Sequence, residues 1–255
     1  MGHHWLTLVF AIGWALLPRE ALAQPAAMRT AGNQVPDLAD VAEHLLSRTN
    51  AFRQQEGLPP VVPSPQLTAA AQNFAAFMAR TNQLSHTADG QTPEARAKAY
   101  GYDPCVIAEN IAAQHNPVGF TTETLAEGFF QGWQHSPGHR KDLLDPAVTE
   151  TGVGVAQSQQ TGAYSAVQLF GRPMSQAIEF QVTNQTDTAI TYAVDGHTFP
   201  LPPRTTRTHQ QCRPPEVTFQ WPGTQEKKTV HPSPGDRYTI AQGEAGAFRV
   251  EPRGS

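Results

Sequence analysis

The sequence predicts an α+β protein in which an antiparallel sheet covered by helices is followed by a small all-β domain. Helix signals recur up to Trp133, and strand-like segments lie between and after them without the regular strand–helix alternation of a parallel sheet. After Gly171-Arg172-Pro173 the sequence pattern changes. Short runs in which apolar and polar residues alternate are separated there by Asn, Asp, Gly and Pro. A chain of 255 residues is long enough for two modest domains.

Four helices are predicted, three of them from their start signals. Asp37 is placed to cap a helix that ends at Gly57, and Ser64-Pro65 and Thr92-Pro93 combine an N-cap with proline at the first helical position. A fourth helix is predicted over residues 122–133 from an apolar stripe at helical spacing, and Pro137 and Gly138 are expected to end it.

Strands are predicted in both halves of the chain. In the first half they are residues 105–113, 150–158 and 164–171, and the stretch "LPPVVPSP" is interpreted as a proline-rich turn. In the second half the pair Asp195-Gly196 lies between two alternating runs and predicts a β-hairpin. We expect a module of about five to seven strands there.

The N-terminus carries an apolar run, residues 5–17, followed by Ala21-Leu22-Ala23. This pattern predicts a cleaved signal peptide at 1–23, and the alternative is an uncleaved membrane anchor. We then expect a flexible lead-in at 24–36, the α+β domain at 37–175 and the all-β module at 176–255. The mature chain has no other segment apolar enough to cross a bilayer, so a secreted or periplasmic location is expected.

The charge of the chain and its two cysteines allow two further expectations. The net charge of −4 supplies no basic surface, so no nucleic-acid binding is expected. Cys105 and Cys212 are the only cysteines, and in an oxidising compartment they either pair or remain as two buried thiols.

Three residues are candidates for one shared site. Glu109 lies in the apolar segment "VIAENIA", where a carboxylate is costly to bury unless it meets a cation, a metal or several donors. With His86 and His139 it would form a two-histidine, one-carboxylate zinc site that keeps a coordination position open. In the alternative, Glu109 pairs with Arg140 and the histidines are solvated. The spacings of 23 and 30 residues (86 to 109, 109 to 139) match no local metal motif.

Several stretches agree, in order, with a known family: "SPQLTAAAQNFAAFMA", "LSHTADG", "AENIAA", "GWQHSPGHRKDLLDPAVTETGVGVA" and "AVQLFG". Residues 38–171 resemble the CAP superfamily of cysteine-rich secretory proteins, antigen 5 and pathogenesis-related 1 proteins, in its cysteine-poor bacterial branch. The resemblance does not extend to the C-terminal module.

The resemblance implies an α-β-α sandwich with a central cavity that family members line with two His and two Glu, some of them binding Zn²⁺. Carried over, the histidines fall on His86 and His139 and the first glutamate on Glu109. The second glutamate falls on Ser136, so one acid is missing and weak zinc binding is expected. His135, Ser136 and Arg140 are expected at the cavity rim.

Two functions from different classes follow from these residues. The interpretation we favour is a non-enzymatic extracellular binding module, because the resemblance implies lipid, glycan or protein ligands. The alternative is a metal-dependent hydrolase or peptidase, with Glu109 and Ser136 as its catalytic candidates, although no nucleophile elbow is present. A third interpretation assigns the β module to docking on the envelope or on a partner.

Overall fold

The computed structural model describes Met1 and residues 35–221, 223, 225–243 and 247–253. The predicted signal peptide and nearly all of the predicted lead-in lie outside these residues. Two regions are distinguished below: the α+β domain, Leu38–Pro173, and the β module, Ile178–Arg253, with a short 3₁₀ helix (Met174–Gln176) between them.

The α+β domain has five α-helices and one four-stranded sheet within its described residues. Its elements are α1 (Leu38–Gln55), β1 (Val62–Pro63), α2 (Pro65–Thr81), α3 (Pro93–Ala99), β2 (Pro104–Gln114), α4 (Thr122–His135), α5 (Pro137–Leu143), β3 (Glu150–Gln157) and β4 (Tyr164–Pro173).

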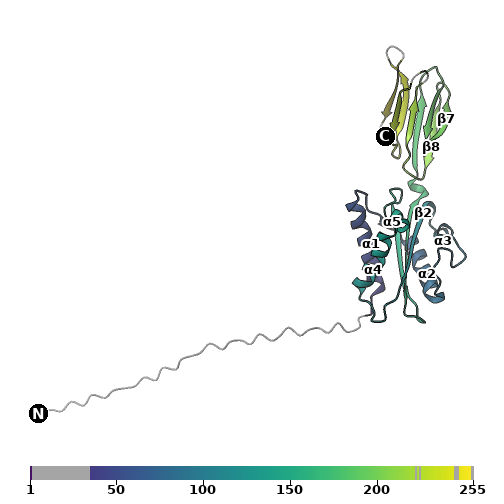
Figure 1. Ribbon diagram of the computed structural model, residues 1–255. Helices are drawn as coiled ribbons and strands as arrows, with labels where there is room; N and C mark the ends of the chain where they lie inside the picture. Colours follow the sequence, from purple (N-terminus) through teal and green to yellow (C-terminus); the bar gives the residue numbers. More distant parts are fainter. Residues whose placement is uncertain (2–34, 222, 224, 244–246, 254–255) are drawn as a thin grey trace. The chain divides into compact units, whose positions relative to one another are not determined.

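This domain is an α-β-α sandwich, as the family resemblance implies. The sheet has the strand order β1-β3-β4-β2, with α1, α4 and α5 over one face and α2 and α3 over the other (Figure 1). Each face has its own apolar core: Phe129 and Trp133 of α4 lie in one, and Phe74 and Met78 of α2 in the other. The predicted fold class is therefore confirmed.

The predicted helix starts are confirmed, and a further short helix follows the predicted four. The Asp37 side chain accepts hydrogen bonds from two backbone N–H groups of α1, and Ser64 and Thr92 cap α2 and α3. Pro137 and Gly138 follow the end of α4, as expected, but they also form the first turn of another helix, because α5 begins at Pro137. Proline suits a first helical position because the N–H that it lacks would have no partner there.

A short strand replaces the predicted proline-rich turn. Val62 and Pro63 form β1, which pairs in parallel with Glu150 and Thr151 at the start of β3. Its two residues give no alternation to detect. Gly152 in β3 allows α2 to lie close to the sheet, because a Cβ there would stand 2.1 Å from the backbone nitrogen of Thr68.

The β module contains eight strands among its described residues, more than the five to seven predicted. They are β5 (Ile178–Asn184), β6 (Ile190–Val194), β7 (His197–Leu201), β8 (Thr206–Gln211), β9 (Val217–Gln220), β10 (Lys227–Val230), β11 (Arg237–Gln242) and β12 (Phe248–Arg253). They form two four-stranded sheets, β10-β9-β6-β7 and β12-β11-β5-β8. The sequence underestimates the number because short, exposed strands such as β10 bury no alternate side chains.

The predicted β-hairpin between β6 and β7 is confirmed. The two strands pair antiparallel, with Val194 opposite His197. Asp195 and Gly196 between them have positive φ values of 49° and 80°, which a two-residue turn that follows the twist of the strands requires.

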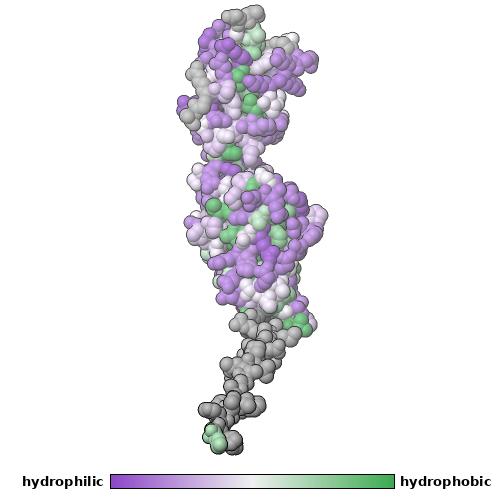
Figure 2. Space-filling view, turned by 90° about the vertical axis from the view of Figure 1, so that its left-hand side faces the viewer, coloured by the Kyte–Doolittle hydropathy of each residue, from purple (hydrophilic) through white to green (hydrophobic). Residues whose placement is uncertain are grey.

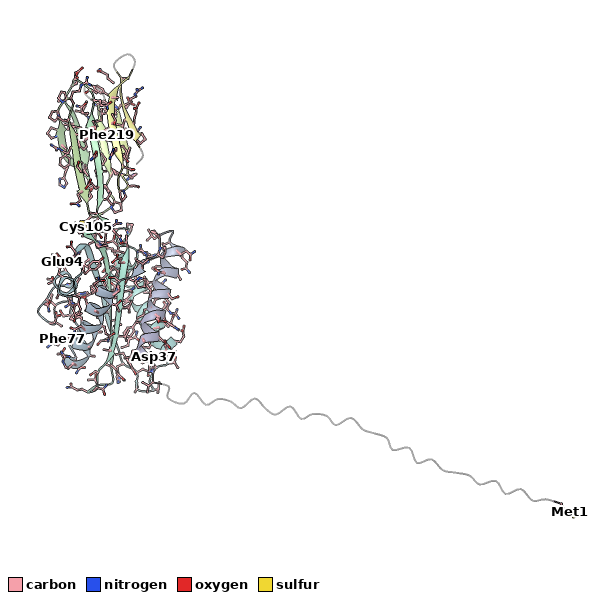
Figure 3. The ribbon with its side chains drawn as sticks, turned by 180° about the vertical axis from the view of Figure 1, so that it is seen from behind. Met1, Asp37, Phe77, Glu94, Cys105 and Phe219 are labelled. Atoms are coloured by element: carbon pink, nitrogen blue, oxygen red, sulfur yellow. A yellow bond between two sulfur atoms is a disulfide. The ribbon has the colours of Figure 1, made fainter. Side chains whose placement is uncertain are left out.

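A disulfide joins the β module to the α+β domain and decides between the two states left open for the cysteines. Cys105, at the start of β2 (Figure 3), pairs with Cys212, which follows β8. Next to it, Arg213 Nη1 donates to both carboxylate oxygens of Asp145, at 3.0 and 2.8 Å. Because Asp145 lies just after α5, the adjacent residues Cys212 and Arg213 connect the module to the start of β2 and to the end of α5.

On the face drawn in Figure 2, hydrophilic residues predominate and hydrophobic ones are scattered among them. No helix in the described part of the chain is long and apolar enough to cross a membrane.

A histidine is buried in the β module. His209 Nε2 lies 2.5 Å from the hydroxyl of Tyr192, and its ring stacks on Phe180 with the centroids 5.0 Å apart. Burial lowers the pKa of His209 below its ordinary value, and the charge of Arg207 lowers it further. The neutral imidazole is therefore the form that the folded module accommodates.

We expect residues 37–174, with Cys105→Ser to avoid an unpaired thiol, to fold without the β module. The reason is that each region packs a separate apolar core. A single cooperative urea transition together with native near-ultraviolet dichroism would support separability. A molten or aggregated product would mean that the β module completes the first domain.

Acid should destabilise the β module through His209. Its pKa is lower in the folded than in the unfolded state, so the unfolded chain takes up the proton first and the free energy of unfolding decreases as the pH falls below about 6.5. Urea titrations between pH 7.5 and pH 5 would show a smaller loss in His209→Gln, which keeps an acceptor for Tyr192 but does not titrate. His197→Gln, at an exposed position, should behave as the wild type.

Candidate functional site

The structure brings His86 and Glu109 into direct contact. His86 lies on the loop between α2 and α3, and half of its side chain is exposed. Its Nδ1 lies 2.9 Å from Oε1 of Glu109, which is in β2 opposite Leu169 of β4. The Glu109 side chain is only 1% exposed, so the predicted burial of this carboxylate is confirmed.

The cation that pairs with Glu109 is Arg96 in α3. Arg96 Nη2 donates to the second carboxylate oxygen, Oε2, at 3.0 Å. Arg140, the partner considered from the sequence, instead donates to Glu56 at 2.8 Å and lies over the ring of Phe52. Both residues of the Arg96–Glu109 pair are almost completely buried, whereas the Arg140–Glu56 pair is half-exposed.

Arg96 also holds the loop that carries His86. Its Nη1 lies 2.7 Å from both carboxylate oxygens of Asp89, and its Nη2 donates to the backbone oxygen of His86 at 2.9 Å. The guanidinium carbon lies 3.3 Å from the centroid of the Phe74 ring. The sequence reasoning missed Arg96 and Asp89. Both residues lie close to His86 in the chain, and this was the only signal that could have indicated them. The sequence does not show that their side chains point towards Glu109 and the His86 loop.

His139 approaches from the other side of β2. It lies in α5, and its backbone oxygen accepts a hydrogen bond of 3.1 Å from Asn110 Nδ2, next to Glu109. Its Nδ1 is buried and has no hydrogen-bond partner among the described residues. Burial lowers the pKa of His139 and the charge of His86 lowers it further, so the two imidazoles interact electrostatically.

The two residues before Pro137 lie at the junction of α4 and α5. His135 ends α4, and its Nδ1 lies 2.9 Å from the backbone oxygen of Gln131 in the same helix. Ser136 lies between α4 and α5, and its side chain makes no capping hydrogen bond to the described chain. His135 is exposed and Ser136 is half-buried.

Charge balance decides the proton positions around Glu109. Burial raises the pKa of this carboxyl group, and Arg96 and His86 both counteract the increase. An ionised carboxylate paired with Arg96 can only accept hydrogen bonds, so Nδ1 of His86 must be the donor. The other ring nitrogen, Nε2, therefore remains as the acceptor or ligand of the neutral ring.

The Glu109 carboxylate is a poor metal ligand in this arrangement. Both oxygens of Glu109 already accept hydrogen bonds, and a metal ligated there would have to displace a buried guanidinium. No group of three or more His, Cys, Asp or Glu among the described residues is arranged to hold a metal ion. Nε2 of His86 and the imidazole of His139 are the nitrogens that could ligate one, with Glu109 orienting the first ring from behind.

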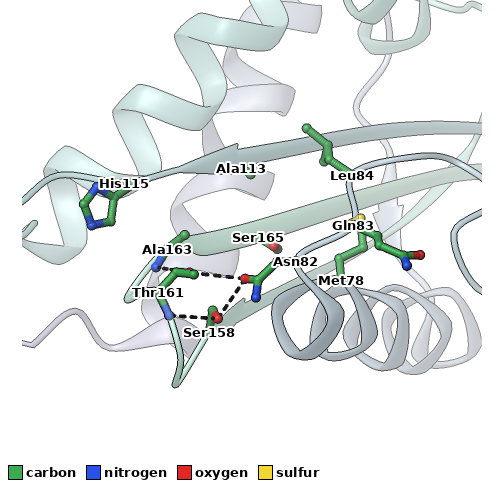
Figure 4. Close-up of a pocket in the computed structure, with 10 residues that line it drawn as sticks. All are labelled: Met78, Asn82, Gln83, Leu84, Ala113, His115, Ser158, Thr161, Ala163 and Ser165. Atoms are coloured by element: carbon green, nitrogen blue, oxygen red, sulfur yellow. Dashed lines mark hydrogen bonds between the residues drawn. The ribbon is translucent and has the colours of Figure 1, made fainter.

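A separate pocket of about 410 Å³ lies at the end of α2, away from the predicted site residues (Figure 4). Asn82 lies at its edge with a left-handed backbone, and its Oδ1 accepts from the hydroxyls of Ser158 and Thr161 at 2.9 and 3.2 Å. The lining residues are Met78, Asn82, Gln83, Leu84, Ala113, His115, Ser158, Thr161, Ala163 and Ser165. None of these is Asp, Glu, Lys or Arg, so the pocket offers no fixed charge to a ligand.

Replacing Arg96 by Ala should reduce the free energy of unfolding by about 3–5 kcal/mol, because it leaves Glu109 buried without its cation. The matched control is Glu56→Gln, which breaks the half-exposed pair with Arg140 and should cost about 1 kcal/mol or less. Urea denaturation of both variants at neutral pH measures the difference. Similar small losses would mean that water or another group compensates Glu109 when Arg96 is absent.

Comparison with known proteins gives the family. Residues 46–170 match the family model described as "CAP: Cysteine-rich secretory protein family". The uncharacterized protein YkwD of Bacillus subtilis (strain 168) is 32% identical over 112 residues. That alignment covers 43% of this chain and 40% of the relative, so it spans less than half of either protein.

Among solved structures, an extracellular protein containing an SCP domain from Bacillus anthracis is 28% identical with a TM-score of 0.46, over 56% of this chain and 45% of that chain. An outer surface protein from Borrelia burgdorferi is 19% identical with a TM-score of 0.48, over 56% of this chain and 99% of that chain. Given the family match and the ordered motifs from "SPQLTAAAQNF" to "AVQLFG", this chain belongs to the CAP superfamily through its α+β domain.

Proposed function

We propose that this protein is a secreted, non-enzymatic binding module in which His86 and His139, beside the edge strand β2, hold a divalent metal weakly. The observation that carries the proposal is the Arg96–Glu109–His86 chain of hydrogen bonds, which engages Nδ1 of His86 and, within the described residues, leaves Nε2 of the half-exposed ring for a ligand. The ligand that we propose is an extracellular lipid, glycan or protein, the classes that family resemblance implies.

Two imidazoles support a metal site with open coordination positions. Zn²⁺ accepts imidazole nitrogen readily, and water or a ligand group completes its coordination. The lowered pKa of His139 favours the neutral ring, the form that ligates. Binding is weak because Arg96 engages Glu109 and because Ser136 stands where the family pattern has a second acid. When bound, the metal would supply a Lewis acid that could also anchor an anionic ligand group.

Export is supported by two independent features. The apolar run and the small-residue pattern before Gln24 are typical of a cleaved signal peptide. The Cys105–Cys212 disulfide suits an oxidising compartment, because thiols in the cytosol are kept reduced. We therefore propose a secreted or periplasmic location.

A hydrolase is less well supported than a binding module. The contact between His86 and Glu109 resembles the carboxylate–imidazole pair of a catalytic dyad. In the described part of the chain, however, no hydroxyl hydrogen-bonds to either imidazole, and Ser136 lies between two helices. Both oxygens of Glu109 are engaged, so this group is poorly placed to act as a general base.

Zn²⁺ affinity should decrease by roughly tenfold or more between pH 7.5 and pH 5.5, because a typical imidazole with a pKa of about 6.5 is mostly protonated at the lower pH. Isothermal titration of protein purified without chelator measures the change. His86→Ala/His139→Ala should abolish binding, and His135→Ala should leave it intact because that ring bonds to its own helix.

Equal Zn²⁺ affinity at both pH values, or binding that survives the double substitution, would exclude these ligands. A casein digestion assay addresses the non-enzymatic part of the proposal. Cleavage that a chelator stops and that Glu109→Gln abolishes in a folded protein would establish the hydrolase instead.

A further inference from the structure

We infer that Arg96 is the positioning residue of the candidate site: by holding Glu109 and the loop of His86 together, it fixes which ring nitrogen His86 presents to a ligand. This inference deepens the proposed function and rests on it for the identity of the ligand-facing nitrogen. Arg96 itself lies outside the His/Glu set carried over from the family.

Arg96 connects three separate parts of the fold. From α3 it reaches the carboxylate of Glu109 in β2, the carboxylate of Asp89 in the loop before α3, and the backbone oxygen of His86. Its fourth contact is the Phe74 ring in α2, 3.3 Å from the guanidinium carbon. Loop, helices and strand therefore meet on one side chain that is only 2% exposed.

The chemistry of the contacts requires a guanidinium. Two carboxylates face it, and its planar fork presents separate N–H groups to Asp89 and to Glu109 while its face lies against an aromatic ring. A lysine ammonium carries the same charge but is a point charge with no planar fork and no flat face for stacking. The site therefore requires the planar shape of the Arg96 guanidinium as well as its positive charge.

The consequence for His86 follows from the hydrogen-bond direction. Half of the His86 side chain is exposed, so the ring itself is held mainly by its contact with Glu109. Glu109 stays in line for that contact because Arg96 binds its other oxygen. While this arrangement persists, Nδ1 keeps the proton and Nε2 keeps its lone pair. A free neutral histidine favours the opposite tautomer, so release of Glu109 should be visible as a change of tautomer.

The test is ¹⁵N NMR of the full chain without metal, at a fixed pH of about 8, where a typical imidazole is neutral. His86→Gln assigns the His86 resonances. The wild type should show a protonated Nδ1 and an unprotonated Nε2. Arg96→Met, which keeps a long apolar side chain against Phe74, should shift the ring towards protonated Nε2.

Arg53→Met is the matched control. Arg53 is also a fully buried guanidinium of this domain, but it donates to the backbone oxygens of Pro59, Leu143 and Asp145 and not to Glu109 or the loop of His86. General loosening of the domain should therefore affect both variants, whereas the tautomer of His86 should change only in Arg96→Met. If Arg96→Met does not fold, Arg96→Lys replaces it and should give an intermediate tautomer fraction.

A wild-type His86 pattern in folded Arg96→Met or Arg96→Lys would overturn the inference, as would an equal change in Arg53→Met. Zn²⁺ titration of the same proteins separates this result from the proposed function. If the wild type binds no Zn²⁺ but Arg96→Met still changes the tautomer, the metal proposal fails and the positioning role stands. If the wild type binds Zn²⁺ and Arg96→Met leaves the tautomer unchanged, the positioning role fails alone.

Discussion

The burial of one carboxylate constrains the whole α+β domain. Glu109 lies in a strand between two helical layers, where an unpaired negative charge would be strongly unfavourable. The fold compensates it with a guanidinium from α3 and an imidazole from the preceding loop. The same guanidinium also contacts the loop, because Arg96 bonds Asp89 and the backbone oxygen of His86 as well as Glu109. Stability and site geometry therefore depend on the same few contacts.

Adjacent residues of β2, an edge strand of the sheet, contact the two candidate histidines. Successive side chains of a strand point to opposite faces, so Glu109 serves the His86 side while Asn110 bonds the backbone of His139 on the other side. Cys105 begins the same strand, and its disulfide together with the Arg213–Asp145 pair joins the β module to both β2 and the end of α5. The module is therefore joined to the domain at β2, which contains Glu109, and at the end of α5, which contains His139.

The two candidate histidines differ in exposure and in hydrogen bonding. His86 is half-exposed and oriented by a charge pair behind it, whereas Nδ1 of His139 is buried and unpartnered within the described structure. His209 in the β module is different again, because Tyr192 and packed aromatic rings enclose it and it lies away from any site residue.

Local signals in the sequence were enough to predict the helix starts, the hairpin at Asp195-Gly196 and the α+β class, because caps, turn residues and periodicity act over a few residues. They also identified Glu109 as a buried charge from its apolar neighbours. Three further facts came from the folded arrangement alone: Arg96 rather than Arg140 compensates Glu109, Cys105 pairs with Cys212, and Val62-Pro63 joins the sheet. These contacts join residues 13, 107 and 88 positions apart (Arg96 to Glu109, Cys105 to Cys212, Val62 to Glu150), and their geometry depends on how whole layers pack.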